Sequence, residues 1–325
     1  MNATRRLGST GPTVFPLALG CMGMSGMYGQ ADEKTGIATI HAALESGVTL
    51  FDTGDFYGMG HNEMLLGRAL RGNRERALIS VKFGALRGPD GSWLGFDARP
   101  AAVKTFLAYS LNRLGVGYID IYRPSRRDPA VPIEDTIGAV ADLVKAGYVR
   151  AIGLSEVGPE TIRRAHAVHP IADLQIEYSL VSRGPEARIF PVLAELGIGV
   201  TAYGVLSRGL LSGSAPSGPG DMSRHFPRFA PENLAGNRRL VATLQALAAG
   251  KGVTATQLAI AWVLAKGESM IPVLGARTPA QLAESLSALR LSLSPAEVAD
   301  LEEAMPAVAG DRYAPPQMQM LDSER

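Results

Sequence analysis

The sequence alternates short apolar segments with longer segments of helical periodicity, and this alternation limits the fold more than any other feature. The short segments rarely alternate polar with apolar residues, which is typical of parallel strands buried on both faces. Between them, apolar residues recur three and four positions apart over 103–114, 133–144 and 282–289, which predicts amphipathic helices. We predict eight β-strands, at residues 17–20, 50–52, 77–82, 119–122, 151–155, 174–177, 199–203 and 270–274.

Eight strand–helix units can form a doubly wound sheet or a closed (β/α)8 barrel. A doubly wound dinucleotide-binding domain is expected to open with the pattern G-x-G-x-x-G after its first strand. Here the first strand is followed by Gly20 and Gly23 with no glycine between them. We therefore predict an α/β protein of the TIM barrel class, with residues 1–325 as one domain and chemistry at the strand ends.

Two sequence pairs have the spacing of a helix capping box. Thr278 precedes Gln281 by three positions, and Ser294 precedes Glu297 in the same way. The second pair predicts an extra C-terminal helix beyond the repeating units.

Charge and cysteine content exclude several classes of protein. The chain has 32 Lys and Arg against 31 Asp and Glu, so nucleic acid is not an expected partner. The single cysteine, Cys21, can form neither an internal disulfide nor a cysteine-rich metal site. Residues 7–31 carry no charge, but their longest apolar run, 14–19, is too short for export or for spanning a membrane. We expect a cytoplasmic protein without a membrane partner.

Polar residues stand where the second and third predicted strands end. Asp52 and Lys82 occupy these ends, and Tyr57 lies in the loop after the second strand. Neighbouring parallel strands are about 4.8 Å apart, so the two charged groups can meet if both point into the barrel. An ammonium beside a phenol lowers its pKa, which helps the phenol to protonate a carbonyl oxygen as hydride arrives. A buried ion pair with a purely structural role fits the same spacing.

Three segments resemble the aldo-keto reductase superfamily. They lie at residues 51–58, 140–156 and 271–277, and the resemblance extends over nearly the whole chain. It implies a (β/α)8 barrel with an N-terminal β-hairpin at residues 5–16. It also implies reduction of a small aldehyde or ketone with a nicotinamide cofactor, for which we expect NADPH. The oligomeric state stays undetermined.

The resemblance assigns a catalytic role to four positions. Tyr57 matches the family's general acid, Lys82 the lysine that tunes it, and Asp52 the carboxylate behind that lysine. Ser125 stands where the family usually has a histidine. A serine hydroxyl can donate one hydrogen bond but does not titrate near neutrality. We therefore expect a reductase that depends on Tyr57, with Ser125 or a water molecule orienting the substrate.

Two other functions remain open. The missing histidine is compatible with a regulatory or sensor subunit that binds a nicotinamide cofactor and catalyses weakly. An isomerase or lyase on the same fold is a further alternative, which the predicted cofactor residues disfavour. Arg123, Arg126 and Arg127 can attract an anionic substrate, but we expect them to pair with carboxylates such as Asp128.

The resemblance also implies a cofactor site in the second half of the chain. Ser155 and Gln175 would bind the nicotinamide carboxamide, and Tyr203 would stack on the ring. Arg277, beside a helix N-terminus, would bind a 2′-phosphate and favour NADPH over NADH. Glu156 stands where an asparagine is common. The other predicted contacts are Gly20 and Met22 at the nicotinamide end, Leu206, Ser207, Arg208, Gly209, Leu210 and Gly275 near the phosphates, and Gln281, Glu284 and Ser285 at the adenosine end.

The rim of the pocket is expected to contain aromatic residues and one long loop. Phe56, Phe83 and Trp93 are the aromatic candidates. The loop, residues 212–233, is rich in Gly, Pro, Ser and Arg, and loops of that length inside a compact domain usually cover a binding site. Carbonyl reduction of this kind needs no metal, and we predict none.

Overall fold

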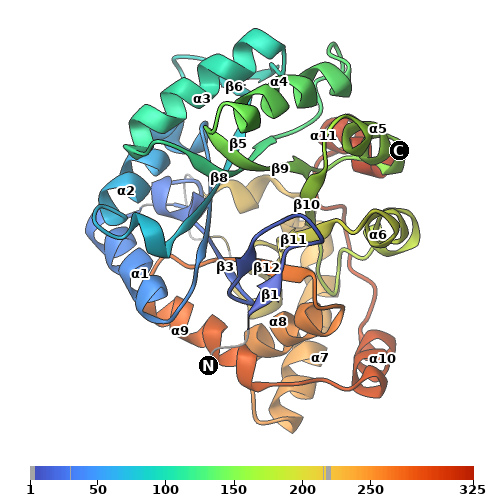
Figure 1. Cartoon of the computed structure of the whole chain (residues 1–325). Helices are drawn as coiled ribbons and strands as arrows, with labels where there is room; N and C mark the ends of the chain where they lie inside the picture. Colours follow the sequence, from blue (N-terminus) through green and yellow to red (C-terminus); the bar gives the residue numbers. More distant parts are fainter. Residues whose placement is uncertain (1–3, 30, 215, 217–220) are drawn as a thin grey trace.

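A closed barrel of eight parallel strands forms the centre of the molecule (Figure 1). The computed structural model describes residues 4–29, 31–214, 216 and 221–325. All eight predicted strands are present, and the TIM barrel is confirmed. Around the barrel the strands follow the order β3, β4, β5, β8, β9, β10, β11, β12. Their bounds are Ala18–Gly20, Leu50–Gly54, Leu78–Phe83, Ile119–Pro124, Val149–Ser155, Ile171–Glu177, Gly199–Tyr203 and Met270–Gly275.

Helices surround the barrel and bury its outer face (Figure 1). The predicted amphipathic segments are confirmed as α3, α4 and α9, and the extra C-terminal helix as α10. A short helix, α11, follows it and was not predicted. The helices are α1 Glu33–Glu45, α2 His61–Ala69, α3 Pro100–Leu114, α4 Ile133–Lys145, α5 Pro159–Val168, α6 Pro185–Leu196, α7 Pro231–Gly250, α8 Ala255–Ala265, α9 Pro279–Ser287, α10 Pro295–Ala304 and α11 Pro315–Met320.

The two predicted capping boxes differ in the structure. Ser294 Oγ accepts from the Glu297 N–H, and Glu297 Oε2 accepts from the Ser294 N–H, so the box before α10 is complete. Thr278 Oγ1 accepts from the Gln281 N–H before α9. The Gln281 side chain, however, accepts from the Arg277 N–H instead of that of Thr278. The box at Thr278 is therefore only half formed.

The predicted N-terminal hairpin covers the end of the barrel at which the strands begin, opposite their C-terminal ends. Its strands are β1 Arg5–Arg6 and β2 Thr13–Val14. Leu7 and Val14 are fully buried against side chains of the barrel interior. Gly8 has a φ of +68°, and a Cβ there would lie 2.5 Å from the Gly199 nitrogen. Glycine is therefore required at this position for the hairpin to lie against β11.

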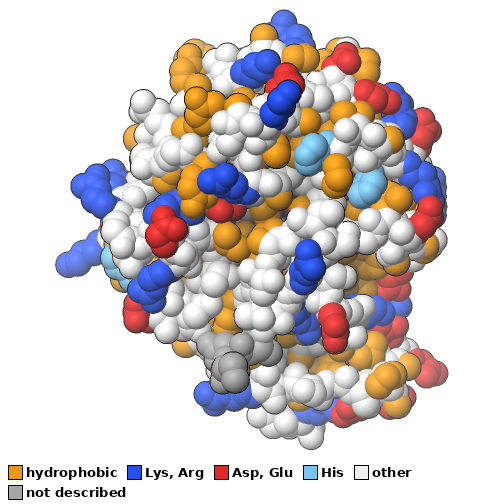
Figure 2. Space-filling view, in the orientation of Figure 1, with side chains coloured by type: hydrophobic (Ala, Val, Ile, Leu, Met, Phe, Trp, Pro, Cys, Tyr) orange, Lys and Arg blue, Asp and Glu red, His pale blue; other side chains and the backbone are white. Residues whose placement is uncertain are grey.

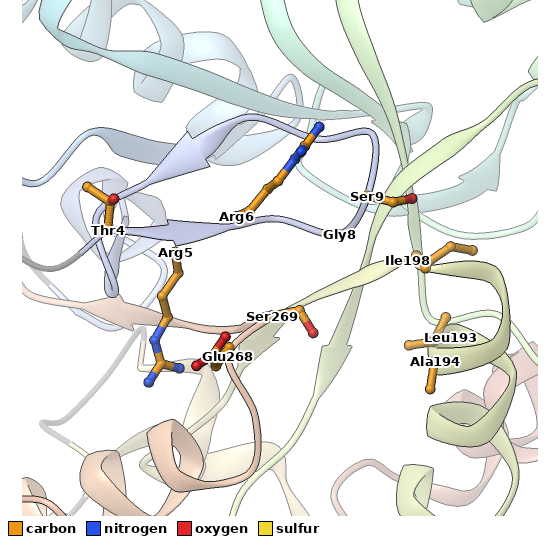
Figure 3. Close-up of a pocket in the computed structure, with 11 residues that line it drawn as sticks. Thr4, Arg5, Arg6, Gly8, Ser9, Leu193, Ala194, Ile198, Glu268 and Ser269 are labelled. Carbon is orange, nitrogen blue, oxygen red and sulfur yellow. The ribbon is translucent and has the colours of Figure 1, made fainter.

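An open hollow of about 630 Å³ lies beside this hairpin (Figure 3). The side chains of Arg5 and Arg6 leave β1 in opposite directions, and Arg5 extends toward the segment before β12. Arg5 Nη1 donates to the carbonyl oxygens of Gly267 and Met270. Arg5 therefore holds the hairpin against the barrel, and its guanidinium nitrogens donate to backbone carbonyl oxygens.

Two further features concern the charges on the surface and the length of the helices. On the face that carries β1, cationic and anionic side chains are mixed and neither sign forms one patch (Figure 2). Within the described residues, no single helix meets the length and apolarity needed to cross a membrane. Helices α7 and α8 meet those criteria only as a pair bent by 83°.

A buried polar layer crosses the barrel interior above the apolar residues of the hairpin. Arg123 is 0% exposed, and its Nη1 lies 2.8 Å from Asp173 Oδ2 and 3.1 Å from Thr201 Oγ1. Arg123 is thus paired with a carboxylate, as expected, but the partner is Asp173 and not Asp128, which accepts from the backbone N–H groups of Ala98 and Ala130. Alternating side-chain direction turns Arg123 into the barrel, where Asp173 on β10 is its counter-ion.

The Arg123–Asp173 pair yields a prediction about stability. We expect Arg123→Met to lower the free energy of unfolding by about 3–5 kcal/mol, because Asp173 would stay buried without a cation. The double variant Arg123→Met with Asp173→Asn should lose less of this free energy, because no buried carboxylate is left without a cation. Urea unfolding followed by circular dichroism measures both. Arg127→Met is the matched control, since its partly exposed ion pair with Asp322 is 3.4 Å long and should contribute about 1 kcal/mol or less. Equal losses in Arg123→Met and Arg127→Met would contradict the prediction.

Candidate active site

The C-terminal ends of all eight barrel strands meet at one cavity of about 940 Å³. Each strand, or the residue directly after it, contributes a lining group, as expected for the functional end of such a barrel. In barrel order these groups are Gly20, Asp52, Lys82, Ser125, Ser155, Gln175, Tyr203 and Gly275.

The ion pair between Asp52 and Lys82 lies at the base of this cavity. Lys82 Nζ donates to Asp52 Oδ1. Asp52 Oδ2 accepts from Ser80 Oγ at 2.9 Å and from Gln175 Nε2 at 2.8 Å. Burial alone would raise the pKa of Asp52, but Lys82, the charge of Arg123 and the hydrogen bond from Gln175 hold that pKa below its ordinary value. The carboxylate therefore stays ionised and fixes the ammonium in position.

Tyr57 lies directly beside this pair. Its side chain is buried, and Lys82 Nζ is 5.1 Å from the centroid of its ring. Burial raises the pKa of Tyr57 well above its ordinary value, Asp52 raises it further, and Arg126 opposes the rise. The sequence analysis expects a lowered pKa, but the net shift is upward, because burial and Asp52 outweigh the cations near the phenol. The phenol is thus held in its protonated form.

The loop that carries Tyr57 has an unusual backbone. Gly58, Met59 and Gly60 all have φ in the left-handed region, at +56°, +54° and +93°. Met59 is a residue that rarely adopts this conformation, and such residues concentrate at functional sites. A Cβ on Gly54 would lie 3.3 Å from the Tyr57 ring. Glycine at position 54 therefore lets the ring lie close over the end of β4.

Ser125 presents a free hydroxyl to the cavity. Its backbone N–H donates to Phe83 O at 2.8 Å, which continues the β5–β8 pairing. The residue is 2% exposed, and its Oγ has no hydrogen-bond partner among the described residues. A buried hydroxyl without a partner is costly unless a ligand supplies one. Arg126, the next residue, also lines the cavity, and the expectation that it pairs with a carboxylate is not met within the described part of the chain.

Most of the predicted cofactor residues line the same cavity. Gln175 is engaged by Asp52, as described above. Two predicted residues lie beneath the lining instead: Ser207 Oγ accepts from Arg228 Nη1, and Leu210 is part of the apolar core. The predicted residues at the cavity are Gly20, Met22, Ser155, Gln175, Tyr203, Leu206, Arg208, Gly209, Gly275, Arg277, Gln281, Glu284 and Ser285.

Arg277 stands beside the N-terminus of α9. Its Nη1 donates to Tyr28 O at 2.8 Å, and no carboxylate of a described residue lies within ion-pair distance. An arginine with spare donors beside a helix N-terminus is suited to a phosphate group. These residues therefore fit the phosphate-bearing part of a nicotinamide cofactor, with Gln281 and Ser285 farther along the helix.

Arg208 already has partners within the protein. Its Nη2 donates to Glu177 Oε2 at 2.9 Å. The guanidinium carbon lies 4.3 Å from the ring centroid of Phe226 and 4.6 Å from that of Tyr313. These contacts hold one face of the arginine in place at the cavity wall.

Glu156 does not line the cavity and instead binds the C-terminal segment. It forms a two-pronged ion pair with Arg312, at 2.8 and 2.7 Å, and accepts from Ser323 Oγ and Tyr203 Oη. Burial would raise the pKa of Glu156, but Arg312 lowers it to about 2. The segment that it binds adds Tyr313, Gln317, Met320 and Leu321 to the cavity wall, which the sequence analysis missed. The only local signal there is Pro315, at the start of α11.

The rim only partly matches the prediction. Phe56 and Trp93 line the cavity, and Trp93 belongs to a hairpin of β6 Ala85–Arg87 and β7 Trp93–Phe96. Phe83 is fully buried against Tyr122, with ring centroids 4.3 Å apart, so its assignment to the rim is wrong. The predicted loop, residues 212–233, contributes Ser214 and Met222 among others to the cavity wall. Its residues 215 and 217–220 lie outside the described residues.

Asp55 is a second titratable group in the Tyr57 loop that the sequence analysis missed. Its Oδ2 accepts from the Gly84 N–H at 3.1 Å, and its Oδ1 is buried without a partner among the described residues. Burial raises the pKa of Asp55 to about 7. The carboxyl thus links the loops after β4 and β5 in a form that titrates near neutrality. No cluster of His, Cys, Asp and Glu suited to a metal ion occurs in the described ranges.

Comparison with known proteins identifies the class of protein that this barrel and site define. The sequence profile of the Aldo/keto reductase family matches residues 16–306. Probable aldo-keto reductase 1 from Glycine max is 42% identical over 317 residues, covering 95% of this chain and 91% of that protein. The chain therefore belongs to the aldo/keto reductase family. Members are nicotinamide-dependent oxidoreductases that act on small carbonyl compounds.

Solved structures agree with this assignment. The glycerol dehydrogenase of Gluconobacter oxydans aligns with a TM-score of 0.84 at 27% identity, covering 98% of this chain and 96% of that one. The holo form of an aldo-keto reductase from Bacillus halodurans aligns with a TM-score of 0.80 at 26% identity, covering 96% and 99%. The chain is thus an oxidoreductase whose family and structural neighbours support carbonyl reduction.

The raised pKa of Asp55 yields a prediction about pH. Between about pH 4 and 7 the unfolded state releases this proton while the folded state retains it, so this group's contribution to stability falls as pH rises. We expect Asp55→Asn to be more stabilising at pH 8 than at pH 5, by at most about 3 kcal/mol, because about two pH units of the shift lie between pH 5 and 7. Urea unfolding at both pH values tests this. Asp142→Asn, on the exposed side of α4, is the control and should change little at either pH. An Asp55→Asn variant with no gain from pH 5 to pH 8 would contradict the prediction.

Proposed function

We propose that this protein, as one barrel domain, reduces a small aldehyde or ketone to the alcohol with NADPH, and that Tyr57 is the proton donor. The observation that carries the proposal is the grouping of Tyr57, Lys82 and Asp52 at the base of the cavity. Lys82 Nζ is 5.1 Å from the Tyr57 ring centroid and is ion-paired with Asp52. A purely structural ion pair has no need of a phenol beside it at the mouth of the barrel.

The protonation states support a donor role for Tyr57. The raised pKa of its phenol keeps the hydroxyl protonated at neutral pH, as a proton donor requires. NADPH, when bound, supplies hydride to the carbonyl carbon. The carbonyl oxygen then gains negative charge, and the Tyr57 hydroxyl gives its proton to that oxygen. Lys82, held by Asp52, stabilises the phenolate that remains.

The hydroxyl of Ser125 would orient the substrate. Its buried hydroxyl has no partner among the described residues and can donate a hydrogen bond to a carbonyl oxygen. A serine hydroxyl does not titrate near neutrality, so Tyr57 would donate the proton without help from a histidine.

The residues at the other side of the cavity support NADPH as the cofactor. Arg277 has no carboxylate partner within the described ranges, and the N-terminus of α9 lies beside it. A 2′-phosphate would accept from this arginine, whereas the 2′-hydroxyl of NADH offers no charge.

Substitution of the proposed donor tests the reaction. We expect Tyr57→Phe to lower kcat by about 100- to 10,000-fold, because the variant loses its general acid. The dissociation constant of NADPH should change little, since the proposed role is in the chemical step. We expect a smaller loss in Ser125→Ala, about tenfold, for one hydrogen bond. Steady-state NADPH oxidation with a panel of aldehydes and ketones measures turnover, and fluorescence titration measures binding.

The same assay separates the enzyme from a sensor subunit. Tight NADPH binding without turnover of any carbonyl compound by the unaltered protein would favour the sensor. Full activity in Tyr57→Phe would remove the proposed proton donor.

Substitution of Arg277 tests the choice of cofactor. We expect Arg277→Ala to weaken NADPH binding by about 10- to 100-fold, the effect of losing a hydrogen-bonded charge. NADH binding should change little, because NADH lacks the phosphate. Dissociation constants for both cofactors provide the measurement. Equal losses for the two would show that Arg277 does not recognise the 2′-phosphate.

A further inference from the structure

The arginines that line the cavity differ in their partners. Arg208 is ion-paired with Glu177 at 2.9 Å. Arg87, Arg126 and Arg277 have no carboxylate within 4 Å among the residues that the structure describes. Unpaired cations in a partly buried cavity are unfavourable unless a ligand supplies negative charge.

The unpaired arginines stand on different sides of the barrel mouth. Arg277 follows β12 and Arg126 follows β8, and these strands are four positions apart in the closed ring of eight. They therefore lie on opposite sides. Arg277 is on the side that we propose for the cofactor phosphate, whereas Arg126 is on the side of Ser125, in the loop directly after β8. One cofactor phosphate cannot serve both arginines.

The position of Arg126 is fixed through one nitrogen. Nη1 donates to Ser125 O at 2.6 Å and to Ser155 Oγ at 3.4 Å. Nε and Nη2 donate to no described residue. Glu156 contributes to the electrostatic environment of Arg126, but it is bound by Arg312 through both of its oxygens. The guanidinium is thus oriented by the protein, with donors left over for a ligand.

The surroundings of Arg126 limit the kind of ligand. The unpartnered Ser125 hydroxyl precedes it in the chain. Much of the remaining wall is apolar, with Phe56, Trp93 and Phe96 among its residues. A planar guanidinium with two free donor groups matches the two oxygens of a carboxylate. In apolar surroundings that attraction is stronger than in water.

We propose that Arg126 binds the carboxylate of the substrate, so that the preferred substrate is an aldehyde or ketone that also carries a carboxylate group. The apolar wall would cover the body of the molecule, and the carbonyl would face Tyr57. This inference rests on the function proposed above and specifies its substrate class. Arg126 would determine specificity and would not take part in proton transfer.

Two probes of nearly equal shape test the inference. These are 4-carboxybenzaldehyde and its neutral carboxamide analogue, 4-formylbenzamide, each assayed with NADPH. We expect the unaltered protein to have the higher kcat/KM for the acid. Arg126→Met should lower kcat/KM for the acid by about 10- to 100-fold, the effect of losing a hydrogen-bonded charge, and change that for the amide by less than about threefold. Arg126→Lys should retain part of the preference, because it keeps the charge without the planar fork.

Arg127→Met provides the matched control. It removes the same charge from the next position, where the side chain faces Asp322 at 3.4 Å and does not line the cavity. We expect its ratio of kcat/KM for acid and amide to equal that of the unaltered protein. Thermal unfolding of each variant checks that the fold is retained.

Several outcomes would overturn the inference while the proposed function stands. One is a kcat/KM for the amide that equals or exceeds that for the acid in the unaltered protein. Another is an equal loss for both probes in Arg126→Met, and a third is a parallel loss of NADPH affinity, which would assign Arg126 to the cofactor.

Absence of turnover for both probes and for other aldehydes would count against the proposed function itself. Calorimetric titration of the acid would then decide the inference, because binding needs no turnover. Weaker binding of the acid to Arg126→Met than to the unaltered protein would support it, and equal binding would overturn it.

Discussion

The interior of the barrel depends on the ion pair and hydrogen bonds that the Asp52 carboxylate accepts. It accepts from Lys82 and Ser80 on β5 and from Gln175 on β10, so it joins strands from different parts of the ring. Ser80 Oγ also accepts from Arg123, which is paired with Asp173. A buried charge is tolerated only with partners, so each member of this chain of contacts depends on the next. The position of the Lys82 ammonium beside Tyr57 follows from this arrangement.

A second group of buried charges organises the mouth of the barrel. Glu156 and Glu177 hold Arg312 and Arg208, and Arg228 lies 3.4 Å from Glu177. Arg312 pairs with Glu156, directly after β9, and lies 3.7 Å from Glu177 at the end of β10. Through Arg312, this group ties the C-terminal segment to these two strands and completes the cavity wall. The two groups have different tasks: the first places the reacting side chains, and the second shapes the space above them. Pairs of this kind contribute more to position than to net stability.

The sequence predicts the strands, helices and central site residues because these leave local patterns. Short apolar segments mark the strands, and a charged residue at the end of such a segment marks Asp52 and Lys82. The alternation of side chains along β5 explains the error at Phe83, because a lysine that points into the barrel sends its neighbour outward to the helices. The Glu156–Arg312 pair joins residues 156 positions apart and leaves no such pattern. The raised pKa of Tyr57 depends on burial, which the order of residues does not reveal.

The hairpin of β6 and β7 gives the protein an intrinsic optical reporter. The chain has two tryptophans. Trp262 is fully buried and stacks on Tyr178, whereas Trp93 is 43% exposed at the rim of the cavity, with the Arg87 guanidinium 5.2 Å from its ring centroid. Trp262 is shielded from solvent, so a change in the wavelength of fluorescence on adding a small molecule that does not absorb tryptophan emission reports mainly the surroundings of Trp93. Binding of a small molecule at the barrel mouth can thus be followed by intrinsic tryptophan fluorescence, without a label.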